Sequence, residues 1–71
     1  SLCRVEPIAI FCRYKQITSV KSDFLQAFTS NELSSIRSFD LSNNEIESID
    51  EFSFTSLVNV TWISLAENQL K

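Results

Sequence analysis

Two stretches of the chain follow one pattern of apolar residues: Ile36-Arg-Ser-Phe-Asp-Leu-Ser-Asn-Asn-Glu-Ile46 and Val60-Thr-Trp-Ile-Ser-Leu-Ala-Glu-Asn-Gln-Leu70. With one more upstream position included, six positions recur at one fixed spacing with the same kind of residue. They are Leu33, Ile36, Phe39, Leu41, Asn44 and Ile46, followed by Leu57, Val60, Ile63, Leu65, Asn68 and Leu70. A period of about 24 residues is too long for a heptad and too short for a domain, so it predicts one recurring structural unit.

Each stretch is typical of a short strand that ends in a turn. Phe39 and Leu41 alternate around Asp40 with the period of a strand, so both apolar side chains should point inward. Asn44 follows where the chain turns into the interior, and its side chain can bond backbone groups that would otherwise be buried unpaired. Asn68 has the same position in the second stretch. The pair predicts a ladder of stacked asparagines; the alternative is two ordinary turn residues at the surface.

Both stretches resemble the leucine-rich repeat pattern LxxLxLxxNxL. Ile49, Phe54 and Leu57 also fall where repeats of this length in the family have apolar residues. The resemblance implies an α/β fold, a fragment of a horseshoe-shaped solenoid with short parallel strands on its concave face and a mostly irregular or 3₁₀ convex side. The implied parts of this single structural domain are a cap with a first irregular repeat over 1–32, a repeat over 33–56 and the truncated start of another over 57–71.

An upstream segment is similar to the cysteine-containing N-terminal cap of extracellular leucine-rich repeat proteins, through Ile10, Cys12, Ile17 and Val20. The resemblance implies that Cys12 takes the inward position of Leu41, with Cys3 across from it on a cap strand. The family cap usually has four cysteines, and this chain has two. The spacing from Ile17 to the matching Ile46 also exceeds the repeat period, by about five residues. We place this insertion within Phe24–Leu33, where Ser30 could cap a short helical turn.

Cys3 and Cys12 are the only cysteines. No further Cys and no His could complete a zinc site with them. Two thiols near the start of a small domain suggest one disulfide and an oxidising compartment. The alternative is two buried free thiols that pack as small apolar groups.

The composition excludes several classes of function. The 71 residues include no His and no Gly, which removes the commonest general base and phosphate-cradling loops. The net charge is −3, which disfavours nucleic acid and anionic membranes as partners. No apolar run is long enough for membrane insertion.

Asp40 and Glu67 could act as a glycosidase pair only in a deep, dry pocket, which a shallow sheet does not supply. The acidic turn over 45–51 lacks the Gly and ligand order of a calcium loop. We therefore predict no enzyme, cofactor or metal site.

Residues between the inward positions should lie on the concave face. Phe11, Tyr14 and Trp62 are aromatic where the pattern does not require it, and Trp, Tyr and Arg dominate binding hot spots. The alternative for Phe11 and Trp62 is that they fold against neighbouring side chains. The predicted ligand contacts are Phe11, Arg13, Tyr14, Ser38, Asp40, Trp62 and Ser64.

The resemblance implies an extracellular protein-binding module, the N-terminal portion of a receptor, adhesion protein or secreted immune or matrix protein. Its partner would be a protein ligand or co-receptor. The alternatives are a purely structural cap of a longer solenoid and an intracellular regulatory repeat protein with reduced thiols. If the protein is secreted, Asn59-Val-Thr61 is an acceptor sequence for N-glycosylation, although such sequences also occur by chance. Because the sequence stops halfway through a unit, we expect self-association or partner contact through the Trp62–Lys71 end.

Overall fold

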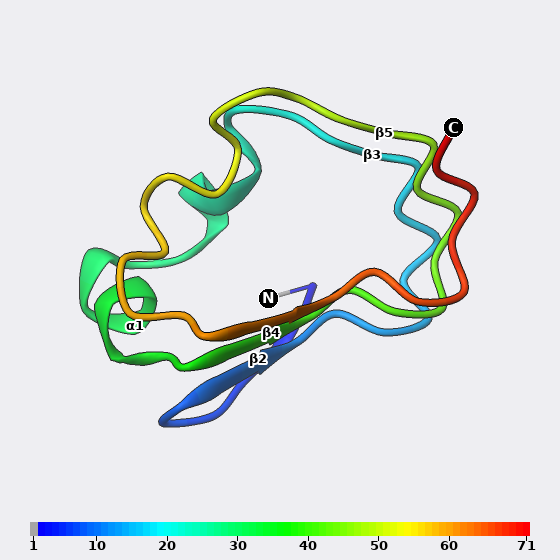
Figure 1. Ribbon diagram of the computed structural model, residues 1–71. Helices are drawn as coiled ribbons and strands as arrows, with labels where there is room; N and C mark the ends of the chain where they lie inside the picture. The colour runs from blue at the N-terminus through cyan, green and yellow to red at the C-terminus, as the bar shows by residue number, and fades with distance from the viewer. Residues whose placement is uncertain (1) are drawn as a thin grey trace.

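The computed structural model describes residues 2–71 of the chain (Figure 1). The first residue of the predicted 1–32 unit lies outside this range. Short strands alternate with small helices, which makes the fold mixed α/β. In chain order they are β1 (Arg4–Val5), β2 (Ala9–Phe11), β3 (Ser19–Val20), the 3₁₀ helix η1 (Phe24–Ala27), α1 (Ser30–Ser35), β4 (Ser38–Asp40), β5 (Ser48–Ile49) and β6 (Trp62–Ser64). Within residues 2–71, no helix has the length and apolar character needed to cross a membrane.

Four of the strands form one sheet in the order β1-β2-β4-β6. β1 pairs with β2 antiparallel, whereas β2, β4 and β6 pair in parallel. β3 and β5 form a separate parallel pair, which Figure 1 shows on the opposite side of the molecule. Each turn of the chain therefore stacks on the turn before it.

The parallel pairs reproduce the spacings of the sequence. Phe39 of β4 lies opposite Ile63 of β6, one repeat period later in the chain. Ile10 of β2 lies opposite Phe39, so this pair has the longer spacing of the first unit. The same longer spacing relates Val20 of β3 to Ile49 of β5. The longer first turn contains η1 and α1, whereas residues 51–59 of the next turn contain no helix.

The helix α1 begins one residue earlier than predicted. The expectation that Ser30 caps it is wrong, because Ser30 is its first helical residue and Thr29 is the N-cap. The Thr29 hydroxyl accepts a hydrogen bond from the backbone N–H of Glu32 at 3.1 Å. The Glu32 carboxylate accepts one in return from the backbone N–H of Thr29 at 2.8 Å. This capping box satisfies two backbone donors, which a lone hydroxyl at Ser30 could not do.

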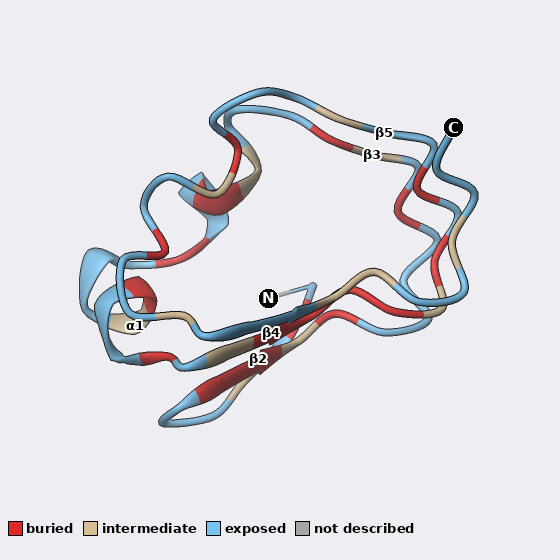
Figure 2. Cartoon of the chain, in the orientation of Figure 1, coloured by how far each residue is buried: buried red, intermediate tan, exposed pale blue. Residues whose placement is uncertain are grey.

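The core is one cluster of apolar side chains enclosed by the turns. Phe39 of the central strand is fully buried, and its ring centre lies 6.0 Å from that of Phe28 and 6.3 Å from that of Phe24. Phe54 of the next turn approaches it at 6.4 Å. Aromatic pairs at such separations add to the stabilisation from burial. Figure 2 shows buried segments in successive turns. The largest fully buried side chains are Phe39, Ile10, Ile36, Leu41, Ile46, Val20 and Cys12.

Candidate functional site

A disulfide joins Cys3 and Cys12, with an S–S distance of 2.04 Å. It links the residue before β1 to the residue after β2, so it staples the two antiparallel strands together. Both cysteines are buried, and Cys12 is fully enclosed. A buried bridge in so small a domain is consistent with an oxidising compartment.

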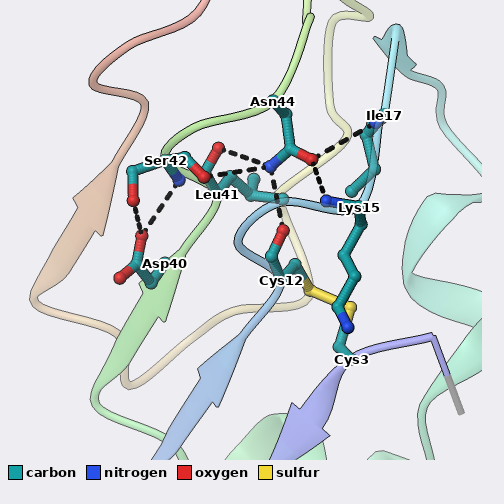
Figure 3. The surroundings of a disulfide bond; sticks show 8 residues. All are labelled: Cys3, Cys12, Lys15, Ile17, Asp40, Leu41, Ser42 and Asn44. Atoms are coloured by element: carbon teal, nitrogen blue, oxygen red, sulfur yellow. Dashed lines mark hydrogen bonds between the residues drawn. A yellow bond between two sulfur atoms is a disulfide. The ribbon is translucent and has the colours of Figure 1, made fainter.

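Asn44 lies next to the disulfide and bonds the backbone of two successive turns (Figure 3). Its amide nitrogen donates to the carbonyl oxygens of Cys12 at 2.8 Å and Leu41 at 2.9 Å. Its amide oxygen accepts from the backbone N–H groups of Lys15 at 2.9 Å and Ile17 at 3.2 Å. The side chain therefore pairs backbone groups where the chain leaves the sheet and turns inward.

Asn68 makes the equivalent contacts one turn later. Its amide nitrogen donates to the carbonyl oxygens of Leu41 at 3.0 Å and Leu65 at 3.1 Å. Its amide oxygen accepts from the backbone N–H of Ile46 at 2.9 Å. Asn44 and Asn68 thus share the carbonyl oxygen of Leu41, which links the two turns into one hydrogen-bonded column.

The side chains that alternate with Ile10, Phe39 and Ile63, the inward positions of β2, β4 and β6, lie in two rows across the sheet. The strand pairing sets the members of each row, because partner residues lie side by side in neighbouring strands. One row places Ser38 next to Trp62, which is 52% exposed. The other contains Phe11, Asp40 and Ser64.

Tyr14 lies beyond the end of β2, in the turn that leaves the sheet, and is 75% exposed. Its φ is positive, at 57°, a conformation that is uncommon in residues other than glycine. Its backbone N–H donates a hydrogen bond to the carbonyl oxygen of Asn43 at 3.0 Å. The tyrosine ring is therefore displayed from a fixed turn and not from the sheet.

Asp40 is a poor direct contact for a ligand, since it is only 8% exposed. One carboxylate oxygen accepts hydrogen bonds from the hydroxyl of Ser42 at 2.6 Å and from its backbone N–H at 2.9 Å. The other oxygen lies 3.5 Å from Nε of Arg13. Asp40 therefore positions the Arg13 side chain.

Phe11 is half-buried and packs against two arginines. The guanidinium carbon of Arg4 lies 4.7 Å from the centre of its ring, and that of Arg13 lies 5.4 Å away. Both distances are within the range of a cation–π interaction. The Phe11 ring therefore packs against neighbouring side chains.

The family model for the leucine rich repeat matches residues 16–70. The chain belongs to the leucine-rich repeat family. Neither a curated protein nor a solved structure shows a significant match to it. The match covers Asn44 and Asn68, whose side chains bond the successive repeats. The disulfide-bonded segment before residue 16 fits an N-terminal cap of this family.

The leucine-rich repeat pattern contains no signal for two further residues of this surface. Arg4 and Lys15 join Arg13, Phe11 and Tyr14 around a shallow hollow of about 380 Å³. Each arginine directly follows a cysteine of the disulfide. Because a disulfide between Cys3 and Cys12 brings the residues that follow them close together, these positions in the sequence could have predicted that Arg4 lies near Arg13.

Asn59 lies outside the sheet face of the repeat, in the segment before β6, and is exposed. Its amide nitrogen donates to the carbonyl oxygen of Ser34 at 2.7 Å, so it also contacts the preceding turn. Thr61 of the same acceptor sequence is exposed as well.

Proposed function

We propose that this chain is the protein-binding N-terminal part of an extracellular leucine-rich repeat solenoid of horseshoe shape. Members of the family generally serve as binding scaffolds, and the fold offers a sheet face built from successive repeats. The exposure of Trp62 beside Ser38 on that face carries the proposal. Large exposed aromatic side chains dominate the energetics of protein interfaces. The partner would be a protein ligand or a co-receptor.

The mechanism is display on a rigid frame. The disulfide holds β1 to β2, and Asn44 ties the turn after β2 to the turn after β4. Side chains on such a frame lose little further freedom when a partner binds, so less of the interaction energy is offset by ordering. Contacts would come from Trp62, Ser38 and Ser64 on the sheet, with Tyr14 and Arg13 at its edge.

An extracellular location is supported by the bonded cysteines, because disulfides persist in oxidising environments. The same observation disfavours the intracellular alternative, which requires reduced thiols. We propose a receptor, adhesion protein or secreted immune or matrix protein as the parent of this segment.

The second candidate is a purely structural cap. The burial of Asp40 and the packing of Phe11 favour it, since both remove side chains from the exposed face. On this alternative the cap covers the core of the first repeat, and binding takes place on other repeats.

Photo-crosslinking distinguishes the two candidates. A photoreactive residue replaces Ser38 on the sheet face, and the matched control carries it at Ser56 on the exposed outer side. Extracellular proteins crosslinked only from position 38 are purified, and their affinities for the unmodified chain and for Trp62→Ala are measured. The binding module predicts about a tenfold or greater loss of affinity with Trp62→Ala. Val58→Ala, at another exposed apolar residue, should change nothing.

The structural cap predicts the opposite result. Equal crosslinking from positions 38 and 56, or full affinity of a folded Trp62→Ala variant, would reject the binding face.

A further inference from the structure

Half of the basic residues of this acidic chain gather at one place. The chain has six Lys and Arg residues and a net charge of −3. Arg4, Arg13 and Lys15, all exposed, line the hollow of about 380 Å³ together with Phe11 and Tyr14. Among the described residues, no acidic side chain lines it. The hollow therefore has a positive rim and an aromatic wall.

The two guanidinium groups are close enough to act on one ligand. Both lie over the Phe11 ring, with their carbon atoms 4.7 and 5.4 Å from its centre. The two guanidinium carbons are therefore at most about 10 Å apart. An anion in the hollow beside Phe11 could therefore contact both groups.

Most of the donors on these arginines remain for a ligand. Nε of Arg4 lies 3.7 Å from the Glu6 carboxylate, and Nε of Arg13 lies 3.5 Å from the Asp40 carboxylate. A guanidinium has five N–H donors, and each of these contacts uses one of them. The acids orient the two groups and leave their terminal nitrogens for recognition of a carboxylate.

The backbone segments that carry the basic side chains are held in place by bonds within the chain. Arg4 follows Cys3 and Arg13 follows Cys12, so the disulfide fixes the separation of the two backbones that carry the guanidiniums. The backbone of Lys15 is held by the amide oxygen of Asn44 at 2.9 Å. Groups fixed in this way bind with a smaller entropic cost.

We propose that this hollow binds a carboxylate side chain from an acidic segment of a protein partner, with an apolar side chain of that segment against Tyr14. The inference rests on the proposed protein-binding function. The size of the hollow suits a side chain better than an extended polyanion. A sulfated polysaccharide is charged along its whole length, so it would also be repelled by residues 38–71, which contain six acidic residues and one basic residue, whereas a single carboxylate side chain acts only at the hollow.

Titration of the ¹⁵N-labelled chain, followed by NMR, tests the site. The probes are the acetylated peptide amide Glu-Glu-Leu-Glu, its matched counterpart Gln-Gln-Leu-Gln, and a heparin oligosaccharide. The Glu peptide should shift the signals of Arg4 and of residues 11–15, and the Gln peptide should not. Arg4→Gln and Lys15→Gln should each lower the affinity for the Glu peptide about tenfold, because each removes one charge-assisted hydrogen bond. Arg37→Gln and Lys21→Gln are the matched controls, since both residues are exposed and lie outside the hollow.

Several outcomes would reject the site. The site is rejected if the Glu peptide does not bind, or if the Gln peptide binds equally well. It is also rejected if heparin binds more tightly than the Glu peptide, or if the control variants lose as much affinity as Arg4→Gln and Lys15→Gln. Arg4→Gln and Lys15→Gln change exposed side chains and remove none from the core, and the same spectra check the folding of both variants. Crosslinking from position 38 without peptide binding would reject only the carboxylate site. Peptide binding without a crosslinked partner would reject the wider binding face and leave the site standing.

Discussion

The side-chain amide of Asn44 donates a hydrogen bond of 2.8 Å to the carbonyl oxygen of Cys12, a residue of the preceding turn of the chain. Since Cys12 is bonded to Cys3, this contact connects the asparagine column to the disulfide. The cap and the first full repeat are therefore tied together by a backbone group that no apolar contact could satisfy.

Replacement of Asn44 by Ala should lower the free energy of unfolding by about 1–3 kcal/mol, because buried backbone groups of Cys12 and Ile17 lose their partner. Urea denaturation measures the loss. Asn68→Ala should cost less, since Asn68 is only half-buried. Asn31→Ala, at an exposed position in α1, is the control and should change little. Equal effects of all three variants would show that the column adds no stability.

The disulfide should be present in native protein and should stabilise the fold. Under non-reducing conditions, mass spectrometry should find the chain lighter than its reduced form by the mass of two hydrogen atoms. The double change Cys3→Ser with Cys12→Ser should lower the stability by about 2–3 kcal/mol, as expected for the short loop that the bridge closes. Two free thiols in freshly folded protein would contradict both the bridge and the extracellular location.

The capping box predicts a local effect at α1. Thr29→Ala removes the hydroxyl that accepts from the Glu32 N–H and should cost about 0.5–2 kcal/mol. Thermal unfolding followed by circular dichroism gives the value. Thr18→Ala, at an exposed position outside any helix, is the matched control. If Ser30→Ala lowered the stability more than Thr29→Ala does, Ser30 and not Thr29 would be the N-cap.

Asn59 should accept an N-linked glycan when the chain is made in a secretory pathway. The acceptor side chain is exposed, and a glycosylated amide nitrogen keeps one N–H for its bond to Ser34. Treatment with an amidase that removes N-glycans should therefore reduce the mass of the secreted protein. Asn59→Gln and Thr61→Ala should both abolish this change. A secreted protein whose mass is the same before and after treatment would contradict the prediction.

The last described turn should mediate self-association of the 71-residue chain. Ile63 and Leu70 are 37% and 45% exposed although they occupy inward positions of the repeat, and exposed apolar patches mark contact surfaces. Analytical ultracentrifugation over a range of concentrations should show dimers that Ile63→Lys disrupts. Ile8→Lys, at an exposed residue between β1 and β2 in the cap, should leave them intact. Monomers at every concentration would mean that this end does not form a contact.

The repeat unit and its spacing could be predicted from the sequence alone. The recurring pattern placed Phe39 level with Ile63, and the longer first spacing placed Ile10 level with Phe39, as the strand pairs show. This succeeded because stacked turns must present apolar residues at matching positions to one continuous core. The disulfide was predictable for a simpler reason, since the chain has only two cysteines.

Some local features are present in the sequence but do not stand out from it. Thr29 and Glu32 have the spacing of a capping box, but the adjacent Ser30 also has a hydroxyl that suits an N-cap. The two hydroxyl residues differ in their backbone conformation: Thr29 is extended, as an N-cap must be, and Ser30 is already helical. Only the path of the chain into α1 decides between neighbours of similar chemistry.

The sequence by itself determined which residues face the core, because periodicity records the inward and outward sides of a strand. The tertiary structure alone decided what surrounds the outward residues. Asp40 is covered because Arg13, which is distant in the sequence, reaches it from the preceding turn. Arg4 joins the same surface because β1 pairs antiparallel with β2, and Lys15 joins it because Asn44 holds its backbone. These neighbours come together through hydrogen bonds and a disulfide between separate turns, which a pattern read along one strand does not contain.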